Sequence, residues 1–329
     1  MNTDYYLKWE KIKMLLFMLI SVVAGFMLAN QSPINSDLRT IVKSPFIAAA
    51  ISFVVGTIFL AVTSLVMSGR VFPSSTFVQT QPAWIWLGGV LGSVYLTSNV
   101  LLFPKIGAIQ TVILPVLGQI VMGSVIDMFG WFGTSQIPIT LARLAGIAIM
   151  TVGVLTAVVL PSVGNKDVRE FDSSTVSGKD RLVVMGWQSW AVLVGFIAAI
   201  QQAINGHLGT LLASPSQASF ISFGVGTVIV IIVALAVDKR VPSIQELKKA
   251  KPWNWLGGFL GALFVLVSVI TVPKIGAGLT IMMGLIGQIF GSILIQQFGW
   301  WRSVKSQVVL AQIVGMIVML VGVVLIKLA

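Results

Sequence analysis

The chain has 329 residues, of which 57% are hydrophobic and only 9% are charged, and its formal net charge at pH 7 is +11. A soluble globule of this length needs more charged side chains to cover its surface. The composition therefore indicates an integral membrane protein. The basic residues lie between apolar stretches and have no nucleic-acid-binding motif beside them, which argues against a nucleic-acid partner. The chain has no cysteine, which excludes disulfides, thiolate metal sites and cysteine nucleophiles.

Apolar stretches of about the length that a helix needs to cross the hydrocarbon layer, roughly 20 residues, follow one another along the whole chain. Their predicted limits are 13–35, 45–67, 84–103, 106–128, 137–160, 184–211, 217–237, 253–272, 275–297 and 306–328. The first stretch follows three lysines, as a signal peptide would, but its polar residues recur deep in the chain, so we assign it to the mature fold. A short surface helix is expected at 243–251.

The second half of the chain repeats the first. Gln31 and Asn35 return as Gln201 and Asn205, at an offset of 170 residues. At an offset of 169, the sequence Trp-x-Trp-Leu-Gly-Gly beginning at Trp84 returns later in the chain, as does Pro-Lys-Ile-Gly-Ala. A period this long in an apolar chain indicates duplicated membrane modules. The predicted division is a first five-helix module at 1–161, a polar linker at 162–182 and a second five-helix module at 183–329.

Because each module has an odd number of spans, the second must enter the membrane from the side opposite to the first. The predicted fold is therefore an all-α integral membrane protein with ten transmembrane helices, arranged as two inverted-topology repeats. Of the 21 Lys and Arg residues, 14 fall on the side of the linker, six on the other side, and Arg143 lies within a span. The positive-inside rule then places the linker in the cytoplasm and both termini outside.

The repeated motifs resemble those of the YdcZ-type inner-membrane exporters, a family of the drug/metabolite transporter superfamily. They are Gln-x3-Asn in the first span, Trp-x-Trp-Leu-Gly-Gly in the third, and Pro-Lys-Ile-Gly-Ala before the fourth. The resemblance covers nearly all of both halves. It implies a fused pair of five-helix modules that carries a small molecule across the inner membrane of a bacterium. It also implies cytoplasmic termini, the reverse of what the charge distribution favours.

Gln119 and Gln288 are the first candidates for a substrate site. Each lies near the middle of a predicted fourth span, and the two are counterparts in the repeat, so inverted symmetry would bring them toward a common axis. The alternative is a hydrogen bond between helices, worth about 0.6 kcal/mol in a membrane.

Gln31 with Asn35, and Gln201 with Asn205, form a second set of candidates for the substrate path. In each pair the residues are four apart and share one helix face. Hydrogen bonds that hold helices together are the competing interpretation, because these residues lie past the centres of their spans.

Asp127 and Arg143 are charged residues at the two sides of the predicted hairpin between spans four and five. Their repeat counterparts are Gln296 and Gln312, so both charges are replaced by amides together. Since an unpaired Arg within a span is costly, we expect an ion pair in one half and a Gln–Gln hydrogen bond in the other. Recognition of an anionic substrate by Arg143 is the alternative, and Asp127 is the one plausible carrier of a coupling proton.

The predicted function is a secondary transporter that exports a small metabolite or drug-like molecule by alternating access. No ATP-binding loop and no interfacial cluster of His, Asp, Glu or Ser is apparent, so neither an ATP-driven pump nor an enzyme is favoured, and no catalytic residue, metal or cofactor is assigned. A lipid scramblase and a non-transporting partner subunit are the alternatives. Membrane lipid and a small solute are the expected partners; a monomer could suffice, and a homodimer is not excluded.

Overall fold

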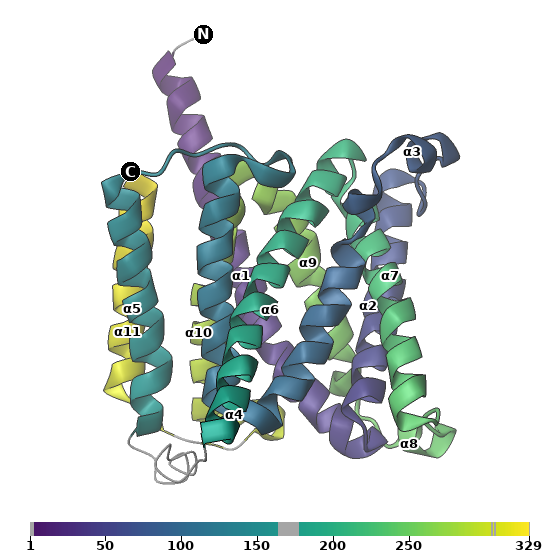
Figure 1. Ribbon diagram of the computed structural model, residues 1–329. Helices are drawn as coiled ribbons and strands as arrows, with labels where there is room; N and C mark the ends of the chain where they lie inside the picture. The colour runs from purple at the N-terminus through teal and green to yellow at the C-terminus, as the bar shows by residue number, and fades with distance from the viewer. Residues whose placement is uncertain (1–2, 164–177, 304, 306, 329) are drawn as a thin grey trace.

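The computed structural model describes residues 3–163, 178–303, 305 and 307–328, and the regular elements among them are all helical (Figure 1). The α-helices are α1 (Thr3–Val42), α2 (Pro45–Ser68), α3 (Ser75–Thr80), α4 (Gly88–Phe129), α5 (Leu141–Val163), α6 (Gly178–Leu211), α7 (Pro215–Asp238), α8 (Ile244–Lys248), α9 (Leu256–Ile275), α10 (Ala277–Phe298) and α11 (Leu310–Leu328). Short 3-10 turns are η1 (Ala83–Trp86), η2 (Trp131–Gly133), η4 (Pro252–Trp255) and η5 (Trp300–Arg302).

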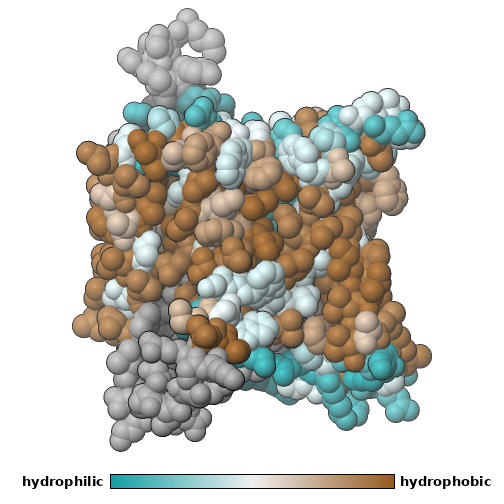
Figure 2. All heavy atoms as spheres, viewed as in Figure 1, coloured by the Kyte–Doolittle hydropathy of each residue, from teal (hydrophilic) through white to brown (hydrophobic). Residues whose placement is uncertain are grey.

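The helices build a membrane protein. Figure 2 shows a broad apolar band between two hydrophilic ends. In the described residues, six helices are long and apolar enough to cross a membrane, namely Trp9–Val42, Pro45–Ser68, Leu182–Leu211, Pro215–Asp238, Pro252–Ile275 and Ala277–Phe298. Shorter apolar helices cover Leu114–Phe129, Leu141–Ala157 and Leu310–Ile326. The all-helical membrane fold is confirmed, while the ten crossings and their inverted repeat remain a prediction.

Corresponding positions in the two halves start and stop corresponding helices. Ser44 and Ser214 each precede a proline and accept hydrogen bonds from backbone N–H groups in the first turns of α2 and α7. Corresponding glycines also end corresponding helices. Helix α4 stops at Gly130 and α10 at Gly299, both in the left-handed conformation that glycine adopts without steric cost. The same kinds of capping residue therefore start and end the corresponding helices in both halves.

The third and fourth predicted spans, 84–103 and 106–128, are not two separate helices. From Gly88 onward both belong to α4, which is helical without interruption and bends back on itself. The indole Nε1 of Trp190, on α6, donates to Ser98 Oγ at 3.2 Å. Gly118, twenty residues beyond Ser98, packs against the carbonyl of Val192, which is also on α6. Twenty residues of straight helix would span about 30 Å, so α4 must double back. The second half has a break here instead, at Gly276, whose φ is +85°.

Two other boundaries differ from expectation. The first predicted span, 13–35, is the much longer α1, which continues past Pro33 to Val42. The predicted linker, 162–182, is helical at both margins because α5 continues to Val163 and α6 begins at Gly178; its residues 164–177 lie outside the described part of the chain. The short helix α8 lies within the surface helix predicted at 243–251.

The two halves interlock. Helix α1 packs against α9 and α10 of the other half, and α6 packs against α4; α2 pairs with α7, and α5 with α11. Glycines allow close approaches between these helices: Gly25 meets the backbone of Gly284, and Gly195 meets that of Pro115. These two contacts correspond to each other in the repeat. We call the set α1, α9 and α10 bundle one, and the set α6 and α4 bundle two.

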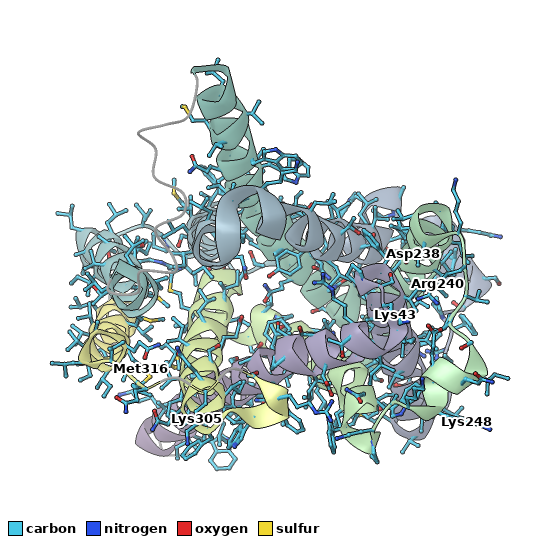
Figure 3. The ribbon with its side chains drawn as sticks, turned by 90° about the horizontal axis from the view of Figure 1, so that it is seen from below. Lys43, Asp238, Arg240, Lys248, Lys305 and Met316 are labelled. Atoms are coloured by element: carbon cyan, nitrogen blue, oxygen red, sulfur yellow. The ribbon has the colours of Figure 1, made fainter. Side chains whose placement is uncertain are left out.

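The ends of the molecule differ in charge. Helix α3 and both chain termini lie at one end, and α8 lies at the opposite end (Figure 1). Figure 3 shows Lys43, Arg240, Lys248 and Lys305 at the α8 end. Arg240 contacts Glu246 at 3.0 Å there and also donates to the carbonyl of Val42, which ties α1 to the segment after α7. Basic residues therefore gather at the α8 end.

Candidate functional site

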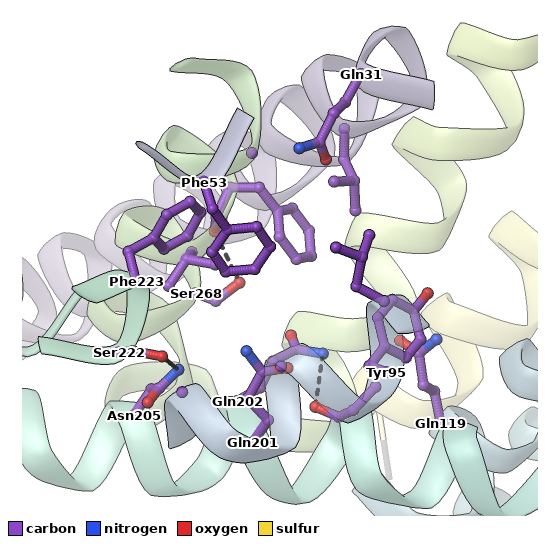
Figure 4. Close-up of a pocket in the computed structure, with 18 of the residues that line it drawn as sticks. Gln31, Phe53, Tyr95, Gln119, Gln201, Gln202, Asn205, Ser222, Phe223 and Ser268 are labelled. Atoms are coloured by element: carbon purple, nitrogen blue, oxygen red, sulfur yellow. Dashed lines mark hydrogen bonds between the residues drawn. The ribbon is translucent and has the colours of Figure 1, made fainter. Parts of the chain in front are cut away.

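A cavity of about 130 Å³ lies between bundle one and bundle two (Figure 4). Helix α1 contributes to one wall and α6 to the opposite wall, while α2 and α7 meet over it through Phe53 and Phe223, whose ring centroids lie 5.0 Å apart. The amide side chains that line the cavity are Gln31, Gln119, Gln201, Gln202, Asn205 and Gln288. The aromatic ones are Phe53, Tyr95, Phe223 and Phe264.

Much of the lining comes in pairs that correspond in the repeat. Gln31 pairs with Gln201, Gln119 with Gln288, Phe53 with Phe223, and Gly92 with Gly261. The glycines leave the room that the glutamines occupy: an added Cβ at Gly92 would lie 2.6 Å from Nε2 of Gln201, and one at Gly261 would overlap Gln31. The same pairing of a glutamine with a glycine thus shapes both sides of the cavity.

Of the six candidate path residues, all line the cavity except Asn35. Asn35 instead accepts a hydrogen bond from Ser52 Oγ at 2.5 Å, so it joins α1 to α2. Its counterpart Asn205 lines the cavity and donates to Ser222 at 3.0 Å. The glutamines of both halves are thus brought together, and the asparagines are not; the role of each in binding remains a prediction.

Several lining residues carried no signal in the sequence. Gln202 is adjacent to Gln201, but its first-half counterpart is Ser32, so the repeat does not highlight it. Phe53 and Phe223 are counterparts, yet a phenylalanine in an apolar span looks the same whether it faces lipid or a cavity. None of the lining residues in the described part of the chain is Asp, Glu, Lys, Arg or His. Amides and apolar side chains therefore line the cavity together, and none of its described lining residues is charged.

Asp127 and Arg143 are in contact, as the sequence predicts. Arg143 Nη2 lies 3.1 Å from Asp127 Oδ2, and Asp127 is fully buried. In the other half, Gln312 Nε2 donates to Gln296 Oε1 at 3.0 Å. Both Asp127 and Arg143 lie outside the cavity lining, and Arg143 is 5% exposed and bound to a carboxylate, so it is not presented to a ligand there.

Asp127 also makes a contact that the sequence did not suggest. Its carboxylate accepts hydrogen bonds from the backbone N–H groups of Ala277 at 2.7 Å and Gly278 at 2.9 Å, in the first turn of α10. These groups have no partner inside the helix, and the residue before α10 is Gly276, which has no side chain to cap them. A carboxylate at this position also complements the positive end of the helix dipole. Asp127 therefore links α4 of bundle two to the first turn of α10 of bundle one.

The comparisons with known proteins point to one family and one fold. The family model described as "Putative inner membrane exporter, YdcZ" matches residues 16–156 and 187–325. A solved structure described only as the crystal structure of a protein superposes with a TM-score of 0.67 at 13% sequence identity, over 95% of this chain and 98% of that chain. This likeness shows the fold alone. No curated protein matches the sequence.

Proposed function

Because the chain belongs to the YdcZ family of inner-membrane exporters and is thus a multi-pass inner-membrane transporter, we propose that it exports a small metabolite or drug-like solute by alternating access. The observation that carries the proposal is the cavity between bundle one and bundle two. Its walls are built from corresponding residues of both halves, chiefly Gln31 with Gln201 and Gln119 with Gln288. Sites at the interface of two repeats are where transporters of this kind bind substrate.

The proposal includes ten membrane crossings in two inverted five-helix repeats, 1–161 and 183–329, joined by the linker 162–182. Two features support it. The corresponding helices α3 and α8 lie at opposite ends of the molecule, as inversion requires (Figure 1). The doubling back of α4 supplies a third and a fourth crossing from one helical element. The basic α8 end would face the cytoplasm by the positive-inside rule.

The moving parts would be the interlocked bundles. Helix α1 packs on α9 and α10, and α6 packs on α4, so each rigid body would draw on both halves of the chain. Toward the α3 end the bundles touch: Gly206 and Gly209 of α6 lie against Val272 and Val269 of α9. Alternating access would require this contact to open in one of the two states.

The experiment that tests the proposal is ligand-induced thermal stabilisation of the purified protein across a library of metabolites and drugs. A solute that binds the native state must raise its stability, by about 2.7 kcal/mol at a concentration of 100 Kd. The variant Gln119→Leu/Gln288→Leu removes two cavity amides, and Gln79→Leu/Gln245→Leu removes two exposed amides as a matched control.

Solutes that stabilise the natural protein and the control, but not the cavity variant, support the proposed site. The same solutes should then move across proteoliposomes that contain the protein. Stabilisation that persists in the folded cavity variant would place binding elsewhere. Lipid movement in the absence of any solute flux would favour the scramblase alternative.

A further inference from the structure

We propose that the cavity takes an uncharged, flat solute of about one ring that both donates and accepts hydrogen bonds, of the chemical class of an aromatic carboxamide. This inference rests on the proposed function, because it names the substrate class of the same site. Four properties carry it: the lack of charge in the lining, its unpartnered amides, its aromatic side chains and the size of the cavity.

The lack of charge favours a neutral solute. No acidic or basic side chain of the described residues lines the cavity, so a bound ion would lose its hydration without gaining a counter-charge. Such a transfer is costly unless the ion is paired. The buried charges Asp127 and Arg143 already neutralise each other outside the lining. Both organic cations and carboxylates are therefore disfavoured.

The amides supply a hydrogen-bonding edge. Within the described part of the chain, the side chains of Gln31, Gln119, Gln201 and Gln288 have no hydrogen-bond partner, although each offers two donors and an acceptor. Oε1 of Gln202 is also unpartnered, and this residue is only 8% exposed. Figure 4 shows Gln31 on one side of the cavity, opposite Gln201 and Gln202. A solute with both donors and acceptors would satisfy these groups, and a hydrocarbon would not.

The aromatic rings and the size of the cavity define the rest of the solute. Phe53, Phe223, Phe264 and Tyr95 line the cavity, and aromatic side chains favour contact with a ring of the solute. The volume of about 130 Å³ is close to that of an engineered protein cavity of about 150 Å³ that admits benzene. One ring with one small substituent therefore fits.

Nicotinamide is a direct probe, because it has close relatives that differ in one property at a time. Nicotinate carries a negative charge, nicotinamide methylated on its ring nitrogen carries a positive charge, and pyridine lacks the amide. Binding of radiolabelled nicotinamide to the purified full chain is measured, and each unlabelled relative is added as a competitor. We expect nicotinamide to bind and each relative to compete at least about tenfold more weakly, a difference of about 1.4 kcal/mol.

Two variants separate the question of where nicotinamide binds from the question of which class of solute binds. Nicotinamide binding should be lost in Gln119→Leu/Gln288→Leu and kept in Gln79→Leu/Gln245→Leu. If nicotinamide does not bind, or if nicotinate or the methylated cation competes as well as nicotinamide does, the assigned class is wrong. The cavity as a transport site would still stand if a charged solute bound instead and its binding required the two cavity glutamines. Binding of nicotinamide that is unchanged in the cavity variant would overturn the class and the site together.

Discussion

The side-chain oxygens of Thr57 and Thr227 lie 2.7 Å apart, although 170 residues separate them in the chain. Each is the counterpart of the other in the repeat. A residue can touch its own counterpart only where the axis that relates the two copies runs between them. Phe53 and Phe223, one helical turn away, meet in the same manner. The proposed pseudo-two-fold axis would therefore pass between α2 and α7, beside the cavity.

The threonine contact can be trapped covalently, because the chain has no cysteine of its own. In Thr57→Cys/Thr227→Cys, mild oxidation should form an intramolecular disulfide in most of the protein, detected by mass spectrometry of the linked peptides. Thr57→Cys/Thr151→Cys is the control, since Thr151 is on α5, which does not pack against α2 in the described contacts. Equal cross-linking in both variants would contradict the arrangement of α2 and α7.

The contacts that Asp127 makes with Arg143 and with the first turn of α10 should contribute strongly to the stability of the protein. Asp127→Gln leaves Arg143 and two backbone N–H groups without a carboxylate, and Arg143→Gln leaves Asp127 without its cation. Each single change should lower stability by about 3–5 kcal/mol, as when one partner of a buried ion pair is removed. The measurement is the midpoint of thermal unfolding together with the yield of monodisperse protein.

The double variant Asp127→Gln/Arg143→Gln copies the amide pair of the other half and should recover part of that loss. Recovery should be incomplete, because Ala277 and Gly278 still lack the carboxylate that they bind in the natural protein. For comparison, Gln312→Leu in the other half should cost only about 1 kcal/mol. A double variant that is no better than the worse single variant would argue that the two residues are not energetically coupled.

The close approach of α1 and α10 at Gly25 should not accommodate a side chain. A methyl group at Gly25 would overlap the carbonyl of Gly284, so Gly25→Ala should destabilise the protein by about 1–3 kcal/mol through overpacking. Gly224→Ala is the matched control: apart from the neighbouring backbone of its own helix, no atom lies within 4 Å of its added Cβ, so it should be neutral or stabilising by up to about 1 kcal/mol. Equal unfolding midpoints for the two variants would contradict the interlocked packing.

The interlocking also predicts how the halves behave when separated. If the chain is expressed as two fragments, 1–163 and 178–329, α1 should find α9 and α10, and α6 should find α4, across the cut. The fragments should therefore co-purify when expressed together, and each should aggregate when expressed alone, because its packing faces are left uncovered. Two fragments that are each monodisperse alone and do not associate would show that the halves fold independently.

The sequence predicts those parts of the fold and site that depend on polar residues in an apolar setting. The sequence predicts that Asp127 and Arg143 touch, because an unpaired charge in a span is costly. The glutamines are candidates for the site because they are amides near the middle of apolar helices and recur at the repeat distance. Helix starts such as Ser44 before Pro45 are local signals that need no tertiary context.

What the sequence could not predict depends on shape and on backbone groups. The packing of α1 on the other half is made by close approaches such as Gly25 to Gly284, and glycines are frequent in all of the spans. The second role of Asp127 is invisible because its partners are the backbone N–H groups of Ala277 and Gly278, which any residue would supply. Hydropathy likewise does not distinguish a phenylalanine that faces lipid from one that faces a cavity.

The central claim, that the cavity lies on an alternating-access path, is tested most directly by accessibility to a small, membrane-impermeant thiol reagent. Ala198→Cys places a single cysteine in the lining of a chain that has no other and leaves all the glutamines in place. In sealed vesicles of each orientation, the account predicts that this cysteine is modified from both sides of the membrane. When Gly209→Cys/Val269→Cys is added to this variant and oxidised to a disulfide, modification from the α3 side alone should be abolished. Modification from neither side, or from one side only in the unlocked protein, would contradict it.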